Sequence, residues 1–233
     1  MQQWFLETQR QFNSAFMLEE RWKLYVHGLF TTVEIAVLAA LVGLTIGTMV
    51  CLMNLSSTRK GKPTFLHYVA LVYIDIIRGT PSVLQLLIMW FIIMKNSNNG
   101  VLVAVLSFGI NSGAYVAEIM RGGIQAVNPG QMEAGDSLGM TRFMTLRYVI
   151  LPQAFRNALP ALCNEFITLL KETAIVGYVS LADLTRVANQ VSSRTYQPFM
   201  PLIGAAVIYF AIIKILTILF GRLERRLRRN ASR

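Results

Sequence analysis

The sequence predicts an all-α polytopic membrane protein with five transmembrane helices, and three observations lead to this fold class. Of the 233 residues, 54% are hydrophobic and only 15% are charged, whereas a soluble domain carries roughly a quarter charged residues. The mean hydropathy is +0.49. The apolar residues are also gathered into runs long enough to cross a bilayer, so we expect a single membrane domain.

The basic composition fits the same fold class. The formal net charge of +10 is also typical of nucleic-acid-binding proteins, but Lys and Arg lie at the ends of apolar runs here rather than among stacking aromatic residues. We therefore expect contact with membrane lipid and none with nucleic acid. Cys51 and Cys163 lie in apolar surroundings without CxxC spacing or a nearby histidine, which predicts packed side chains rather than a metal or redox site.

Residues 1–23 combine aromatic and apolar residues with charges of both signs. This pattern predicts an N-terminal interfacial segment, either a short helix at the membrane surface or a loose tail. Glu7, Glu19 and Glu20 interrupt it, so it lacks the continuous apolar stretch of a signal peptide.

The five-span domain is expected over residues 24–221. Its spans are predicted at residues 25–54, 65–94, 101–120, 158–181 and 199–220. The second is interrupted by Arg78-Gly79-Thr80-Pro81, and because neither half alone can cross ~30 Å of hydrocarbon, we expect the two halves to make one crossing together. A polar hairpin at 183–197 precedes the last span, and a basic cytoplasmic tail, 222–233, follows it.

The distribution of basic residues predicts the orientation. Five spans place the 54–64 linker, the loop at about 128–157 and the C-terminus on one side of the membrane. Thirteen Lys and Arg residues fall on that side and six on the other. Because cytoplasmic segments carry the excess of basic residues, we expect the N-terminus outside and the C-terminus inside the cytoplasmic membrane.

The stretch from residue 128 to residue 160 is too polar to cross a bilayer. Its pattern predicts a short helix that carries Glu133 in its first turn, an interruption at Gly139, and a second helical piece that leads back into the membrane. Side-chain bulk is small along Ala134-Gly135. We therefore expect a protruding helix that docks into a partner.

This stretch resembles the cytoplasmic loop of binding-protein-dependent ABC importer permeases, whose pattern is Glu-Ala-Ala, three residues, Gly, nine residues, Ile, one residue, Leu-Pro. The matching residues here are Glu133-Ala134-Gly135, Gly139, Val149 and Leu151-Pro152, with Gly135 and Val149 as departures. The resemblance implies a type I ABC importer-like fold with a cytoplasmic coupling helix. The ATPase-coupling residues that it implies are Glu133, Ala134, Gly135, Leu138, Gly139 and Pro152.

Further segments resemble the polar amino acid branch of these permeases, which carry histidine, glutamine, glutamate or arginine. They are Ile77-Arg78-Gly79-Thr80-Pro81 with Gln85, Gly113-Ala114-Tyr115 with Glu118 and Arg121-Gly122-Gly123, and Lys171-Glu172-Thr173-Ala174-Ile175 with Asp183-Leu184-Thr185. Glu172, Ala174 and Ile175 depart from the branch. The resemblance covers residues 25–220 and implies an amino acid permease subunit of the bacterial inner membrane.

The resemblance also implies partners. They are an ATP-binding cassette ATPase dimer that binds ATP and Mg, an extracytoplasmic substrate-binding protein, and a second permease subunit that is either identical or related. The sequence itself contains no GxxxxGK[ST] segment, so ATP is not bound here by that route and we expect no cofactor in this chain. Five spans without an internal repeat make a thin bundle, which favours a path between two protomers.

Ionisable residues at membrane depth are candidates for the substrate path. Asp75, Arg78 and Glu118 are such residues. A helix broken at Gly79-Thr80 has free backbone groups that can bind a zwitterion, while a plain proline kink closed by an Asp75–Arg78 pair is the alternative. Glu118 and Arg121 have the spacing of a pair along one helix face.

The fourth span carries a second group of candidates. Asn164, Glu165, Thr168 and Lys171 fall at helical spacings that define one polar stripe centred on Thr168. Such a stripe has to face away from lipid, so it either lines the path or joins the two protomers.

Two other functions compete with the importer. An ATP-independent channel or ion-coupled carrier leaves the central loop unexplained. An intramembrane enzyme needs a nucleophile–base pair or metal ligands, but His27 and His67 have no carboxylate or cysteine at ligand spacing. We therefore expect no catalytic residue and no metal site.

Overall fold

The computed structural model describes residues 1–56 and 62–229, and the regular elements within them are all helical. In chain order they are α1 (Gln2–Phe12), η1 (Asn13–Met17), η2 (Leu18–Glu20), α2 (Trp22–Asn54), α3 (Phe65–Arg78), α4 (Ser82–Ile88), η3 (Met89–Ile93), α5 (Gly100–Gln125), α6 (Gly130–Ser137), α7 (Arg142–Thr145), η4 (Leu146–Ile150), α8 (Leu151–Glu172), η5 (Thr173–Val179), α9 (Leu184–Thr195) and α10 (Phe199–Arg229). Arg59 and Lys60 of the predicted linker and residues 230–233 of the predicted tail lie outside the described residues.

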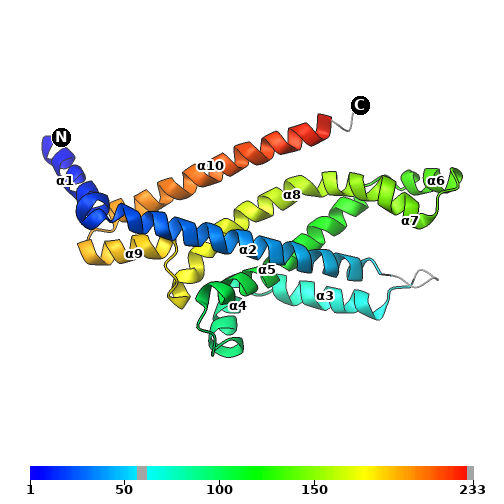
Figure 1. Ribbon diagram of the computed structural model, residues 1–233, viewed down its shortest axis with the longest axis horizontal. Helices are drawn as coiled ribbons and strands as arrows, with labels where there is room; N and C mark the ends of the chain where they lie inside the picture. The colour runs from blue at the N-terminus through cyan, green and yellow to red at the C-terminus, as the bar shows by residue number, and fades with distance from the viewer. Residues whose placement is uncertain (57–61, 230–233) are drawn as a thin grey trace.

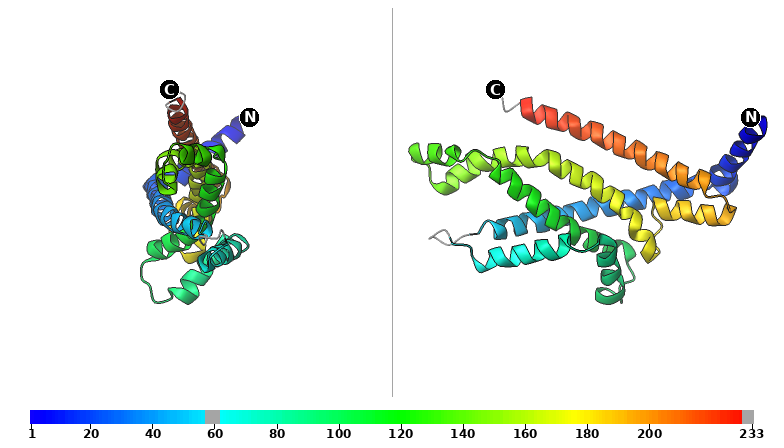
Figure 2. Two further views of the ribbon diagram at one scale, coloured as in Figure 1. Left: turned by 90° about the vertical axis from the view of Figure 1, so that its right-hand side faces the viewer. Right: turned by 180° about the vertical axis from the view of Figure 1, so that it is seen from behind.

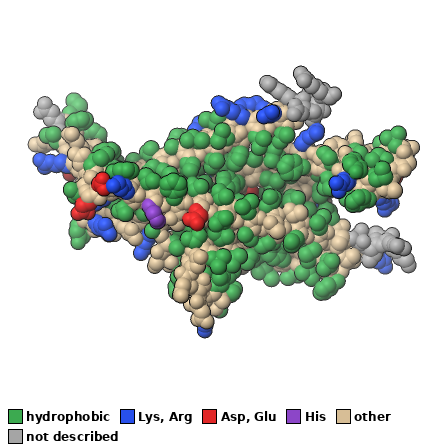
Figure 3. Space-filling view, in the orientation of Figure 1, with side chains coloured by type: hydrophobic (Ala, Val, Ile, Leu, Met, Phe, Trp, Pro, Cys, Tyr) green, Lys and Arg blue, Asp and Glu red, His purple; other side chains and the backbone are tan. Residues whose placement is uncertain are grey.

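The helices form an elongated bundle whose two ends differ (Figure 1). The short helices α6 and α7 lie at one end of the long axis, and α9 lies with the N-terminus at the other. Figure 2 shows the same separation from behind. On the face drawn in Figure 3, hydrophobic side chains cover most of the body, while Lys and Arg lie mainly toward its extremities, as expected of a molecule whose middle is in lipid.

Four segments of the described chain have the length and apolarity of a membrane span. Three are single helices, at Trp22–Asn54, Gly100–Gln125 and Phe199–Leu227, and the fourth is the pair of α3 with α4 and η3. The predicted fourth span is not among them, because α8 carries polar residues along its length. The all-helical membrane fold is therefore confirmed, whereas the count of five spans stays a prediction.

The second span is interrupted where predicted, and its two halves meet at a sharp angle. The two halves together have the length and apolarity of one span, but they meet at a bend of 102°, so a single crossing stays a prediction. Gly79 closes α3 by donating its N–H to the carbonyl oxygen of Asp75 at 2.9 Å, and Pro81 takes an extended backbone conformation before α4 begins. Since proline has no N–H to continue the helix, the chain changes direction here.

Close packing of α2 on α5 is the central helix contact. Gly43 and Gly47 on α2 and Gly109 and Gly113 on α5 repeat at four-residue spacing, which lets two backbones approach closely in a membrane. A Cβ at Gly47 would lie 2.5 Å from Val116, and one at Gly109 would lie 2.5 Å from a side-chain atom of Val42. The glycines of each helix thus receive the branched side chains of the other.

A buried apolar cluster joins this pair to the remaining spans. Ile35 of α2, Leu86 of α4, Phe108 of α5, Leu169 of α8 and Val176 of η5 pack together and are almost fully buried. The cluster holds α4 and η5 against α5. It therefore fixes the broken span and the C-terminal end of α8 in one rigid core.

The segment predicted as a polar hairpin is instead the amphipathic helix α9. Asp183 caps it by accepting the N–H groups of Thr185 at 2.9 Å and Arg186 at 3.0 Å, and Leu184 and Val187 lie on its buried face. The capping aspartate and the apolar spacing of the segment account for the difference.

Of the two alternatives predicted for the N-terminal segment, the structure shows the helix. Phe16 packs on Tyr25 with ring centroids 4.9 Å apart and against Gly204 of α10. The predicted tail begins inside α10, which continues without a break to Arg229.

We predict that Gly47→Leu disrupts the packing of α2 on α5. A side chain at this position meets Val116 and also the carbonyl oxygen of Gly113, 2.9 Å from the added Cβ, so we expect a loss of stability of about 3 kcal/mol. Thermal unfolding in detergent measures it. Gly122→Leu is the control, since nothing lies within 4 Å of a Cβ at Gly122, and equal melting temperatures for the two variants would contradict the packing.

Candidate functional site

The first candidate site is the exposed helix α6 at one end of the molecule (Figure 1). Glu133 and Ala134 are exposed, and Leu138, the residue after the helix, is 80% exposed. A leucine that protrudes in this way next to a small exposed surface is typical of a docking element.

Two glycines shape α6, each by a different mechanism. Gly135 is buried against Thr145, and a Cβ at Gly135 would overlap the threonine side chain, so glycine permits α6 to pack on α7. Gly139 has a φ of +71° and open space around it. It ends the helix because Met140 N–H donates to Gly135 O and Gly139 N–H to Asp136 O, both at 3.0 Å. Gly135 thus allows a close approach within the chain, whereas Gly139 supplies the left-handed turn that ends α6.

The loop is anchored to the bundle by a small apolar cluster. Val127 after α5, Ile150 of η4 and Ala154 of α8 are buried together, and Met132 of α6 packs against them. Pro152 is exposed near the start of α8, directly after the π-helical turn η4, and it cannot donate a backbone N–H to that turn. The coupling residues predicted from the sequence therefore lie around one element that α5 and α8 hold from both sides.

The second candidate site is the break in the second span. Gln85 of α4 donates its side-chain N–H to the carbonyl oxygen of Ile77 at 2.8 Å, which is the helical acceptor that Pro81 leaves unpaired. The same amide nitrogen donates to Oγ1 of Thr80 at 2.8 Å, and its oxygen accepts an N–H from buried Asn111 of α5 at 3.0 Å. A carbonyl expected to be free at the break is therefore already satisfied by Gln85.

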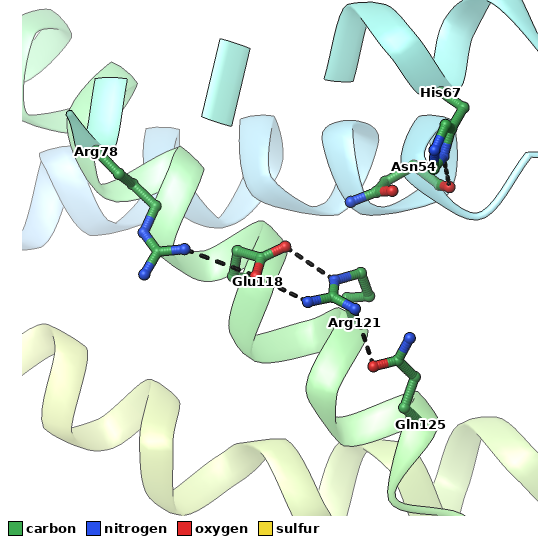
Figure 4. Close-up of polar contacts among 6 residues, drawn as sticks. All are labelled: Asn54, His67, Arg78, Glu118, Arg121 and Gln125. Carbon is green, nitrogen blue, oxygen red and sulfur yellow. Dashed lines mark hydrogen bonds and ion pairs between the residues drawn. The ribbon is translucent and has the colours of Figure 1, made fainter. Parts of the chain in front are cut away.

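Charged residues at this break form a chain of contacts along α5 (Figure 4). Arg78 lies 3.6 Å from Glu118, and Arg121 donates to both oxygens of Glu118, at 2.8 and 2.9 Å. Arg121 also donates to Gln125 at 2.9 Å, and the guanidinium of Arg78 lies 5.3 Å from the ring centre of Tyr115.

These contacts correct one prediction and confirm another. The alternative of an Asp75–Arg78 ion pair is wrong, because tertiary packing brings Glu118 of α5 to Arg78, whereas Asp75 stays exposed. The pairing of Glu118 with Arg121 is confirmed. Two arginines share one carboxylate, so the group Arg78, Glu118 and Arg121 carries a net positive charge. Gly79 and Thr80 are exposed beside it.

The predicted polar stripe of α8 divides between two environments. Glu165 accepts a hydrogen bond from Ser112 of α5 at 2.8 Å and lines a hollow of about 300 Å³ between α2, α5, α8 and α10. Asn164 lines a different hollow of about 210 Å³ between α8 and α10. Thr168 is half-buried and Lys171 is exposed. The structure thus brings Glu165 to α5, near one hollow, and leaves Asn164 and Lys171 away from it.

Sequence reasoning did not assign site roles to Asn111, Ser112 or Thr145. Asn111 and Ser112 were visible only as a polar interruption of the third span, and each faces a different neighbouring helix. Thr145 gave no signal, because its importance comes from its contact with Gly135.

We predict that Gln85→Leu destabilises the protein by about 1–3 kcal/mol, because it leaves buried polar groups without partners. Asn111→Leu should cost a similar amount. The double variant should cost less than the sum, since both partners of the hydrogen bond are then apolar. Thermal unfolding of the three variants measures this coupling, with Gln190→Leu on the exposed face of α9 as the control. Strictly additive losses would contradict the contact.

The chain is similar to known membrane transport proteins over most of its length. Residues 43–229 match the family described as binding-protein-dependent transport system inner membrane component. The chain is 39% identical over 208 residues to the arginine transport system permease protein ArtQ of Bacillus subtilis, covering 88% of this chain and 93% of that protein. It is 37% identical over 209 residues to the glutamine transport system permease protein GlnP of Escherichia coli, covering 88% and 93%.

Two solved structures are similar in fold. The crystal structure of an amino acid ABC transporter with histidines superposes with a TM-score of 0.82 at 44% identity, covering 90% of this chain and 97% of that chain. An inward-facing structure of the MetNI methionine ABC transporter has a TM-score of 0.76 at 20% identity, covering 88% and 96%, and shows likeness of fold alone.

Proposed function

Because this chain belongs to the family of binding-protein-dependent transport system inner membrane components, we propose that it is the permease subunit of an ATP-driven importer of amino acids. The named relatives are permeases for arginine and glutamine, and the superposed structure with 44% identity is an amino acid ABC transporter. The excess of basic residues on the side of α6 and the C-terminus supports an orientation with the N-terminus outside the bacterial cytoplasmic membrane.

The observation that carries this proposal is the construction of α6. Its exposed residues Glu133 and Leu138 stand at the end of the molecule, while Gly135 locks the helix onto Thr145. A helix that is fixed to its own bundle and exposes one face can pass a partner's motion to the spans. On this proposal the partner is an ATP-binding cassette ATPase, which binds ATP and Mg itself, and Ala134, Gly139 and Pro152 complete the coupling surface.

The proposed substrate path rests on the free-energy cost of exposing charged side chains to lipid. Asp75, Arg78 and Glu118 are partly or fully exposed on the single chain, and such groups face protein or water within a membrane. A second permease subunit that covers this face, identical or related, would enclose the path. Arg78 has guanidinium donors beyond its contact with Glu118, so it suits the carboxylate of an amino acid, and exposed Asp75 suits the ammonium group.

The remaining path candidates extend this surface. Gly79 and Thr80 lie at the break, and Asn164, Glu165, Thr168 and Lys171 lie on α8. Transport then has two stages. An extracytoplasmic substrate-binding protein delivers the amino acid, and closure of the ATPase subunits on ATP moves α6 and alternates the access of the path.

We predict that Glu133→Lys with Gly139→Trp abolishes copurification of the ATPase. The first change reverses an exposed charge, and the second places a bulky side chain at a left-handed backbone position that favours glycine. Pull-down from membranes, with ATP hydrolysis of the eluate, measures the result. Leu138→Asp tests the same surface without altering the backbone.

The matched control for this experiment is Gln190→Lys with Ser193→Trp, which changes exposed residues of α9 at the opposite end. This control should retain the ATPase. If the α6 variants retain a fully active ATPase, or if no ATPase copurifies with the wild type, the proposed importer function is wrong. An ATP-independent channel or carrier is then the favoured function.

We predict that Arg78→Gln lowers amino acid uptake at least about tenfold, because a charge-assisted hydrogen bond to the substrate carboxylate is lost. Arg78→Lys should retain part of the uptake. The ATPase should still copurify with both variants, which separates this effect from a loss of assembly. Lys95→Gln, at an exposed position, is the control. Equal amino acid uptake by Arg78→Gln and Lys95→Gln would show that Arg78 does not bind the substrate.

A further inference from the structure

A hollow at the end of the molecule opposite α6 has no role in the sites described above. It has a volume of about 600 Å³ and lies between η5 and α9. Its polar lining consists of Ser180, Thr185, Arg186 and Asn189, and Tyr178 contributes an aromatic wall. The volume is within the range of small-molecule sites, roughly 300–1,000 Å³. The proposed orientation puts this hollow at the extracytoplasmic mouth.

Arg186 stands out in this lining because its guanidinium has no anionic partner. Among the described residues no carboxylate oxygen lies within 4.0 Å of it, and its Nε is buried without a hydrogen bond. The arginine stem lies beside η5, since a Cβ at Gly177 would be in ordinary van der Waals contact with Cβ and Cδ of Arg186, at 3.5 and 3.6 Å.

The nearest acidic residue does not neutralise Arg186. The carboxylate of Asp183 accepts the backbone N–H groups of Thr185 and Arg186 and a hydrogen bond from the Tyr209 hydroxyl at 3.5 Å. Burial raises the pKa of this carboxyl above its usual range. Asp183 is therefore engaged in capping α9 rather than in pairing with the guanidinium.

Helix electrostatics add to the positive potential in the hollow. Arg186 lies in the first turn of α9, where the helix dipole disfavours a cation and favours an anion. A partly buried cation without a partner is also costly. Both costs fall when an anion binds beside Arg186, and the planar guanidinium matches a carboxylate with two parallel hydrogen bonds.

We propose that this hollow is a carboxylate subsite in which Arg186 binds a carboxylate that arrives from outside the membrane. Only the source of the carboxylate depends on the proposed function. The source is either the entering amino acid or an acidic side chain of the substrate-binding protein. Ser180, Thr185 and Asn189 supply hydrogen bonds to the neighbouring polar atoms of either ligand.

The first test needs no transport activity. In the purified permease, the modification of Arg186 by phenylglyoxal is read by mass spectrometry in sodium acetate and in sodium chloride at equal ionic strength. Acetate should slow the modification of Arg186 severalfold and leave that of Arg194, an exposed arginine of the same helix, unchanged. Equal rates for Arg186 in the two salts would overturn the subsite, whether or not the importer function holds.

The second test identifies the source of the carboxylate. The complete importer in proteoliposomes is titrated with loaded binding protein, for the wild type, Arg186→Gln, Arg186→Lys and the control Arg194→Gln. A rise of roughly tenfold or more in the half-saturating concentration of Arg186→Gln assigns the carboxylate to the binding protein. A similar fall in maximal uptake at unchanged half-saturation assigns it to the amino acid.

Other outcomes are equally informative. Hydrolysis of ATP in the absence of binding protein should stay at the wild-type level in the control Arg194→Gln. The affected quantity, half-saturation or maximal uptake, should be intermediate in Arg186→Lys because this variant keeps the charge. Arg186→Gln within twofold of Arg194→Gln in both quantities overturns the subsite. A wild-type complex without ATP-driven uptake contradicts the proposed function instead, and the acetate experiment then decides the subsite alone.

Discussion

The contact between α2 and α5 is the constraint on which the rest of the structure depends. Paired glycines bring the two backbones together, and α5 then presents its other faces to the remaining helices. Asn111 turns to Gln85 of α4, Glu118 to Arg78 at the end of α3, and Ser112 to Glu165 of α8. A membrane offers little hydrophobic force between helices, so close backbone packing and polar contacts of this kind have to hold them.

The polar groups at the broken span are satisfied within the protein, and this requirement links the fold to the proposed path. The 102° break of the second span exposes a backbone carbonyl that lipid cannot solvate, and Gln85 supplies the missing donor. Arg78 and Arg121 share Glu118, which leaves the group one positive charge in excess. The residue that stabilises the broken helix thus lies beside the charged group that gives its surface a preference for anions.

Local patterns predicted the elements, whereas tertiary packing decided the contacts. The helices α2, α5 and α10 follow from long apolar runs, and α6 follows from Gly139 and the small residues before it. Gly79 and Pro81 predict a break but carry no information about its angle. The i, i+3 spacing of Asp75 and Arg78 suggested an ion pair, but Arg78 instead pairs with Glu118, forty residues away in the sequence. The polar residues of the α8 stripe face different surroundings, because the adjacent residues Asn164 and Glu165 point about 100° apart on a helix.

Helical continuity offers a physical route between the two ends of the molecule. From Arg142 to Val179, the elements α7, η4, α8 and η5 follow one another without a turn or extended residue between them, a length of about 55 Å at 1.5 Å per residue. One end of this run holds α6 through Gly135 and Thr145, and the other end forms a wall of the hollow that contains Arg186. The run is continuous but not straight, because it includes the π-helical turn η4, Pro160 inside α8 and the 3-10 helix η5. On the proposed function, movement of α6 by the ATPases is passed along this run to the outer hollow, and a ligand bound there biases the position of α6 in return.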